Sequence, residues 1–149
     1  MELHPATVHF PIALTFTAGA CYLYALIRNS SQAGTFGFLL HAIGVGGMIA
    51  AVLTGRQAES QLVHTPSIQE LVEPHESIAY LSLWLFAMML IWQYLRRSRY
   101  QKIEQVLFTL VFWILLGVMG YGAHLGGKMV YEEGAGVKPL QEMLDSPKP

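Results

Sequence analysis

Residues 106–123 read VLFTLVFWILLGVMGYGA and contain no charged side chain. A helix of this length, rising ~1.5 Å per residue, nearly spans the ~30 Å hydrocarbon core of a bilayer. Three more stretches of the same kind run approximately over residues 7–27, 35–53 and 78–95. Since the sequence has no strand pattern typical of a membrane barrel, it predicts an all-α fold: an integral membrane, antiparallel four-helix bundle formed as a single domain over residues 1–149.

The composition excludes several classes of protein. The 149 residues are 53% hydrophobic and only 13% charged, whereas an average soluble domain carries roughly 25% charged residues. The single cysteine, Cys21, excludes a disulfide framework, a cysteine-only zinc cluster and covalent haem attachment through CxxCH. A net charge of -1 provides no basic field for nucleic acid, which we exclude as a partner. No Ser-His-Asp order, HExxH pair or phosphate-binding glycine loop supports a hydrolase or a nucleotide-binding protein.

Basic residues are concentrated in two short segments, 28–34 and 96–105. These hold five of the nine Lys and Arg residues, namely Arg28, Arg96, Arg97, Arg99 and Lys102. A high density of basic residues beside membrane spans indicates the cytoplasmic side. The sequence therefore predicts a bacterial inner (plasma) membrane protein with four spans, both termini outside, a polar outer loop over 56–77 and a polar outer tail over 128–149.

Three histidines fall at the outer ends of three predicted spans. They are His9, His75 and His124, and His4 lies about one turn further out. Ionisable residues at membrane depth usually face the interior of a bundle, and imidazole is a common ligand of haem iron. Because the first and third helices of such a bundle can face each other diagonally, His9 and His75 are predicted to bracket one haem b, with His124 as a substitute ligand or the ligand of a second haem.

His41 lies deeper, near the middle of the second predicted span, and glycines flank it along one helical face. The pattern Gly37, His41, Gly44 has a counterpart in the fourth span, which carries Gly117, Gly120, His124 and Gly127. Glycine beside a ligand histidine lets a porphyrin approach the backbone, so His41, Gly44 and Gly120 are candidate cofactor-binding residues. The alternatives are helix packing for the glycines and a hydrogen bond from His41 to Thr17 or Tyr22.

These residues predict a membrane b-type cytochrome-like electron-transfer protein, or a subunit of a redox complex, rather than a stand-alone enzyme. Two histidine ligands leave haem iron no open site, which suits electron transfer. Glu76 and Thr7 are the expected acceptors for the other imidazole nitrogens. Acidic residues on the outer side favour a basic periplasmic cytochrome as partner, and other redox subunits or a second copy of the chain are further expected partners besides the lipid bilayer.

Two alternatives stay open at this point. Imidazole also suits copper and zinc. The first alternative is therefore a non-haem metal site built from His4, His9, His75 and His124, with nearby Glu73 or Glu76. The glycine-rich helices are also typical of a cofactor-free scaffold subunit packed within a larger membrane complex.

Four motifs together resemble one known family. They are HPATVHFPIAL at 4–14, AAVLTG at 50–55, PHE at 74–76 and HLGGKMVYEEGAGV at 124–137. The chain is similar over nearly its whole length to a bacterial family of predicted membrane proteins of unknown function, which open with an HPxxVHFPIAL-type signature. The resemblance implies a four-helix membrane domain, associated with redox proteins and b-type haem. It implies roles for His4, His9 and His75 and for Gly126, Gly127 and Tyr131, and it does not extend to His41 and His124.

Overall fold

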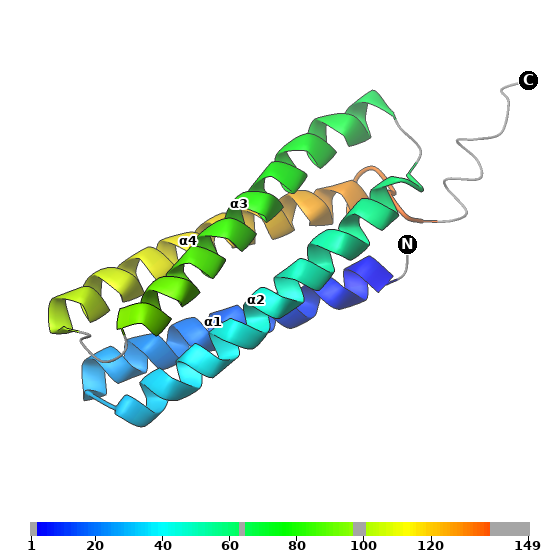
Figure 1. The fold of residues 1–149 in the computed structure, drawn as a ribbon. Coiled ribbons are helices and arrows are strands. Elements are labelled where there is room, and N and C mark those ends of the chain that lie inside the picture. Colours follow the sequence, from blue (N-terminus) through cyan, green and yellow to red (C-terminus); the bar gives the residue numbers. More distant parts are fainter. Residues whose placement is uncertain (1–2, 63–64, 97–100, 138–149) are drawn as a thin grey trace, which may run out of the picture.

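Four helices run up and down in the computed structural model, which describes residues 3–62, 65–96 and 101–137. They are α1 (Leu3–Arg28), α2 (Ser31–Glu59), α3 (Pro66–Arg96) and α4 (Lys102–Tyr131). Each is long and apolar enough to cross a membrane. The start of α1, the α2–α3 connection and the end of α4 lie at one end of the bundle, which we call the outer end (Figure 1). The predicted antiparallel four-helix bundle is confirmed.

The helices are longer than the predicted spans. Much of the stretch 56–77, expected as a loop, is helical: α2 continues to Glu59 and α3 begins at Pro66. Proline suits the first helical turn, where its missing N–H has no intrahelical partner to lose, and the Thr65 hydroxyl accepts a hydrogen bond from the Ile68 N–H at 3.3 Å. Hydropathy marks the part of a helix that fits the bilayer, so it does not detect polar turns that continue outside. Residues 138–149 of the expected tail lie outside the described residues.

The bundle consists of two helix hairpins. α1 packs mainly against α2, and α3 mainly against α4, with smaller contacts between α1 and α4 and between α2 and α3. Close approach within the first hairpin depends on glycine, because a Cβ on Gly44 would lie 2.8 Å from Thr15 Cγ2. Gly44 therefore serves helix packing, the alternative to cofactor binding.

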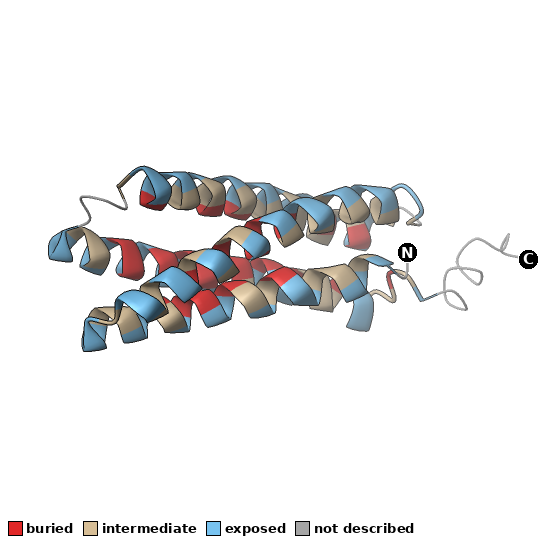
Figure 2. Cartoon of the chain, turned by 60° about the horizontal axis from the view of Figure 1, so that its bottom comes forward, coloured by how far each residue is buried: buried red, intermediate tan, exposed pale blue. Residues whose placement is uncertain are grey.

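The core is narrow and lies along the bundle axis, while the outward faces of the helices are exposed (Figure 2). Large apolar side chains such as Trp84, Ile91 and Leu110 lie on these outer faces, as expected where lipid replaces water. Among the residues that the structure describes, five buried side chains are polar: Thr15, His41, Ser82, Gln93 and Thr109. Buried polar side chains in a membrane bundle are costly and mark candidate functional positions.

Candidate functional site

His75 lies half-buried near the outer end of α3 and turns towards α4. Its Nδ1 donates a hydrogen bond to the backbone carbonyl of Gly122 at 2.9 Å. The ring also lies against Gly126, where a Cβ would come within 3.1 Å of its Cε1 atom. Within the described part of the chain, Nε2 has no hydrogen-bond partner. This arrangement fixes the ring and leaves the Nε2 lone pair available, as in histidines that ligate metals.

His4 occupies the equivalent place in the other hairpin. Its Nδ1 lies 3.2 Å from the Thr54 hydroxyl of α2. A Cβ on Gly55 would come within 3.0 Å of its Cε1, so each ring rests on a glycine of the neighbouring helix. His4 and His75 both lie at the outer end of the bundle, in different hairpins, and we call them the outer histidine pair.

His9 and His124 lie on the outside of the bundle. Both side chains are exposed, and His9 Nδ1 bonds to the carbonyl of Pro5 in its own helix. The expected bracket of His9 and His75 is therefore not formed. Across the described residues there is no group of three or more His, Cys, Asp or Glu side chains placed to hold a metal ion, so the four-histidine metal cluster is not assembled either.

His41 is fully buried at the middle of the bundle, and both of its ring nitrogens have protein partners. Nε2 lies 3.0 Å from the Phe86 carbonyl, and Nδ1 lies 3.3 Å from the Tyr22 hydroxyl. The hydroxyl in turn donates to Gln93 Oε1 at 2.7 Å. The expected partner Tyr22 is confirmed, whereas the Thr17 hydroxyl donates to Ala13 of its own helix. With both nitrogens engaged, His41 has none left for iron.

Aromatic rings enclose His41 on its remaining sides. The ring of Phe112 from α4 lies 4.9 Å away between centroids and that of Phe86 lies 5.8 Å away, both edge-on. The network of Tyr22, His41 and Gln93, which we call the midplane network, therefore links α1, α2 and α3 inside an aromatic shell. A site packed in this way has no room for a planar cofactor such as haem.

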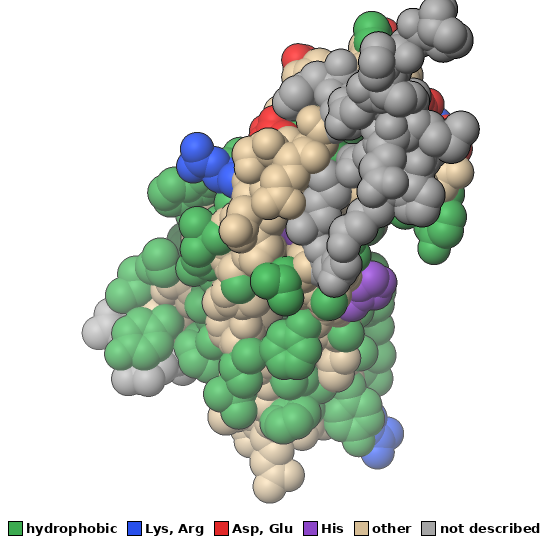
Figure 3. Space-filling model, turned by 90° about the vertical axis from the view of Figure 1, so that its right-hand side faces the viewer, with side chains coloured by type: hydrophobic (Ala, Val, Ile, Leu, Met, Phe, Trp, Pro, Cys, Tyr) green, Lys and Arg blue, Asp and Glu red, His purple; other side chains and the backbone are tan. Residues whose placement is uncertain are grey.

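Acidic side chains lie at the outer end of the bundle. Glu76 directly follows His75 in α3, and Glu59 is the last residue of α2. The Thr7 hydroxyl donates to the Leu3 carbonyl. The groups that hold the two rings are thus Thr54 and the Gly122 carbonyl, not the expected Glu76 and Thr7. Figure 3 looks onto this end, where acidic side chains show near the top and histidine shows lower down, among apolar side chains.

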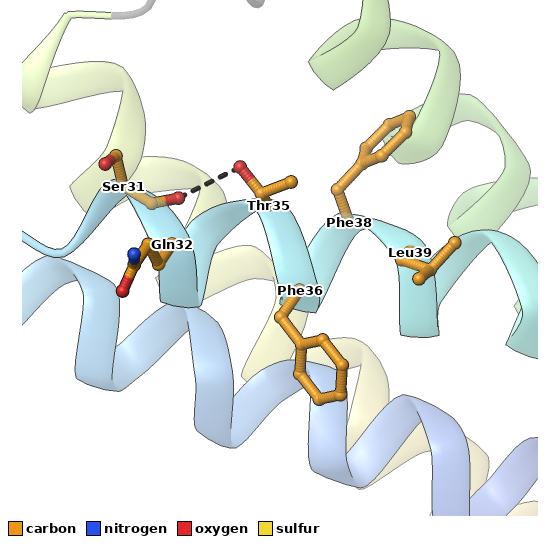
Figure 4. Close-up of a pocket in the computed structure, with 6 residues that line it drawn as sticks. All are labelled: Ser31, Gln32, Thr35, Phe36, Phe38 and Leu39. Atoms are coloured by element: carbon orange, nitrogen blue, oxygen red, sulfur yellow. Dashed lines mark hydrogen bonds between the residues drawn. The ribbon is translucent and has the colours of Figure 1, made fainter.

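Two cavities differ in size and in position. A small one of about 70 Å³ adjoins His4 and is lined by Leu3, His4, Thr54, Gln57, Ala58 and Gln61. A larger open hollow of about 480 Å³ lies at the opposite end, along the start of α2, and is lined by Ser31, Gln32, Thr35, Phe36, Phe38 and Leu39. Figure 4 shows Phe38 turned towards one neighbouring helix and Phe36 to the other side. The larger hollow contains no titratable side chain, so the histidine chemistry belongs to the outer end.

Comparison with known proteins identifies the family. The profile of the predicted membrane protein family DUF2231 matches residues 1–139. The chain belongs to this family. The resemblance inferred from the four sequence motifs is confirmed, and the membrane location with it. No curated protein and no solved structure matches the chain.

Sequence reasoning missed three residues of this DUF2231 chain that hold the histidines. Gln93 had a signal, since it is the single amide side chain within the four predicted spans. Thr54 lies in the quoted AAVLTG motif, beside Gly55. Gly122 acts through its carbonyl, and a backbone group leaves no signal in the sequence.

Proposed function

We propose that the protein is a membrane electron-transfer protein that binds b-type haem at the outer end of the bundle, with His4 and His75 as the axial ligands. The observation that carries the proposal is the outer histidine pair: two imidazoles from different hairpins, each with Nδ1 held by the protein. His4 replaces His9 as the partner of His75, because the His9 ring is exposed and bonded within its own helix.

The chemistry of the donors fits haem. A carbonyl that accepts from Nδ1–H, as Gly122 does from His75, selects the tautomer whose Nε2 can ligate iron and raises the basicity of that nitrogen. Haem bound by two histidines supplies a one-electron Fe(II)/Fe(III) couple and has no open position for oxygen. This combination favours an electron carrier over an enzyme.

Haem binding requires the two hairpins to separate at the outer end. The cavity of about 70 Å³ beside His4 takes an ion or a few water molecules, but it does not take a porphyrin. The contacts between the hairpins are fewer than those within them, so separation at the outer end leaves each hairpin intact.

The proposed setting is a bacterial inner membrane with the outer histidine pair on the periplasmic side. Arg28, Arg96 and Lys102 lie at the opposite end of the bundle, which supports a cytoplasmic position for that end. Glu59 and Glu76 lie at the same end of the bundle as the pair, and their charge favours a basic periplasmic cytochrome as electron partner.

An optical spectrum of the purified full chain in detergent, supplemented with haem, tests the proposal. We expect the Soret and α bands of low-spin bis-histidine haem. The low-spin bands should be lost in both His4→Ala and His75→Ala and replaced by a high-spin spectrum, since either change leaves one histidine ligand. His124→Ala is the matched control, because that histidine is level with Gly122 and Gly126 but exposed. A spectrum that is unchanged in both His4→Ala and His75→Ala would refute the ligand assignment.

The small cavity beside His4 favours a second candidate, a copper or zinc ion bound by the outer histidine pair together with water or a partner's ligand. Elemental analysis of the protein as purified separates the two candidates. Haem gives iron together with a Soret band, whereas a copper or zinc site gives that metal without a Soret band. A protein that contains neither haem nor copper or zinc, and that copurifies with other subunits, would instead support the cofactor-free scaffold alternative.

A further inference from the structure

The larger hollow, at the inner end of the bundle, is polar at its mouth and apolar further along α2. We call it the inner hollow, and its volume is about 480 Å³ (Figure 4). In order from the end of the bundle, the lining residues are Ser31, Gln32, Thr35, Phe36, Phe38 and Leu39. A lining that changes from polar to apolar along a membrane helix suits an amphiphilic molecule whose polar group stays at the membrane surface.

The two parts of the inner hollow match the layers of a lipid leaflet in depth. At ~1.5 Å per residue, the polar part from Ser31 to Thr35 extends over ~6 Å along α2. Each headgroup layer of a bilayer is roughly 5–8 Å thick, which is half the difference between the whole bilayer and its hydrocarbon core. Phe36 and Leu39, which are 54% and 52% exposed, follow at the depth of the acyl chains. The inner hollow therefore has the polarity profile of a phospholipid.

Hydrogen-bond donors at the mouth are available to a headgroup. Among the described residues, the Ser31 hydroxyl and the Gln32 amide have no hydrogen-bond partner, whereas the Thr35 hydroxyl donates to the Ser31 carbonyl at 3.0 Å. Arg28 lies three residues before Ser31, at the end of α1, and its side chain is exposed. Within the described part of the chain, Arg28 forms neither a hydrogen bond nor an ion pair. Guanidinium, hydroxyl and amide groups are suitable donors to a phosphate.

The inner end also carries an excess of positive charge. Its described residues include three basic side chains, Arg28, Arg96 and Lys102, and one acidic side chain, Glu104. Glu104 forms an ion pair with Arg96, and Lys102 donates to two uncharged oxygen atoms at the end of α1 and in the turn that follows. Arg28 and Lys102 are thus left without a counter-ion among the described residues. A negatively charged headgroup would supply one.

We propose that the inner hollow binds one anionic phospholipid, whose phosphate contacts Arg28, Ser31 and Gln32 and whose acyl chain lies along Phe36 and Leu39. Basic sites at the cytoplasmic ends of membrane helices bind anionic headgroups in this way. A second copy of the chain fits less well, because two copies inserted in the same orientation bring like-charged ends together. The site goes beyond the proposed electron transfer, and only its placement in the cytoplasmic leaflet rests on the proposed orientation.

Native mass spectrometry of the haem-free full chain in detergent measures the binding of single lipid molecules. The probes are dioleoyl phosphatidylglycerol and dioleoyl phosphatidylcholine, which have the same acyl chains and differ in net headgroup charge. We expect phosphatidylglycerol to bind at least about tenfold more tightly, and Arg28→Gln to weaken its binding about fivefold without affecting phosphatidylcholine. Arg56→Gln is the matched control, because it removes the same charge from an exposed position near the other end of α2.

Leu39→Trp tests the apolar part of the inner hollow. The larger side chain fills the space of the acyl chain, and we expect phosphatidylglycerol to bind about tenfold more weakly because apolar contact is lost. Leu53→Trp is the matched control, since it makes the same change on the same helix at a position that is 62% exposed and lies near the outer end. Both positions are exposed, so both variants should fold, which circular dichroism checks.

Equal affinity for the two lipids, or equal effects of Arg28→Gln and Arg56→Gln, would overturn the proposal. Displacement of phosphatidylglycerol by excess glycerol phosphate would also overturn it, because the ligand would then be a free phosphate and not a lipid. A dimer of the unmodified chain that is lost in Leu39→Trp would assign the inner hollow to a second copy instead. The measurement contains no haem, so this proposal and the haem proposal fail separately.

Discussion

His41 and His75 both turn towards the inside of the bundle, but the protein surrounds them differently. His41 has no exposed surface, both of its nitrogens are bonded to protein and aromatic rings enclose it. His75 is half-buried, one nitrogen is bonded to Gly122 and the other has no partner in the described part of the chain. The first environment holds the helices together, whereas the second leaves a lone pair for a ligand.

The comparison teaches that burial alone does not mark a ligand site in a membrane bundle. The midplane network links the two hairpins, because Tyr22 and His41 belong to one hairpin and Gln93 to the other. At the outer end the contacts of His4 and His75 stay within their own hairpins, with Thr54 and Gly122. The hairpins are therefore joined at the midplane and are less tied to each other where the ligand would enter.

Replacing His41 by alanine should produce the largest loss of stability. The change leaves a cavity inside an aromatic shell and removes hydrogen bonds from Tyr22 and from the Phe86 carbonyl. We expect the free energy of unfolding to fall by about 3 kcal/mol, measured by denaturant titration of the detergent-solubilised protein with circular dichroism. His124→Ala, at an exposed position, should change it by less than about 0.5 kcal/mol. If the two variants unfold with the same free energy, the buried surroundings of His41 contribute no more to stability than an exposed histidine does.

Tyr22→Phe tests the hydrogen bonds of the midplane network without changing its packing. The edge-on contacts of the ring with Phe108 and Phe112, both at 5.1 Å, are retained, while the hydroxyl that faces His41 and Gln93 is lost. We expect a loss of about 2 kcal/mol, because the buried Gln93 Oε1 loses its donor and His41 Nδ1 loses its polar neighbour. Tyr24→Phe is the control, since that side chain is 56% exposed. If both variants melt at the same temperature, the network adds nothing to packing.

The spans and the family were predictable from the sequence, but the direction of the histidines was not. Runs such as 106–123 predict spans because the bilayer demands them. A lipid-facing side and a core-facing side are equally apolar, however, so a membrane helix gives little indication of its rotation. His9 was for this reason expected inside, and its ring is exposed. The rotation of α1 depends on close contacts such as that between Gly44 and Thr15, which involve pairs of residues on different helices.

Gly126→Ala tests the outer end with one added methyl group. Its Cβ would lie 3.1 Å from Cε1 of His75, so the ring must shift by a few tenths of an ångström. We expect haem affinity, measured by optical titration, to fall about tenfold, which corresponds to about 1.4 kcal/mol. Gly120→Ala is the matched control on the same helix, because its Cβ meets nothing within 4 Å. Both glycine-to-alanine changes raise the helix propensity by the same amount. Equal haem affinity in the two variants would argue against His75 as a ligand.

His9→Ala should have the smallest effect, and it separates the two possible partners of His75. The His9 ring is exposed and bonded to the Pro5 carbonyl one turn earlier in α1, and at the membrane surface water can replace that bond. We expect the free energy of unfolding to change by less than about 0.5 kcal/mol and the haem spectrum to stay that of the unmodified protein. Loss of the low-spin bands in His9→Ala, with His4→Ala unaffected, would mean that α1 rotates when haem binds and brings His9 inwards. The haem ligands would then be His9 and His75, in place of His4 and His75.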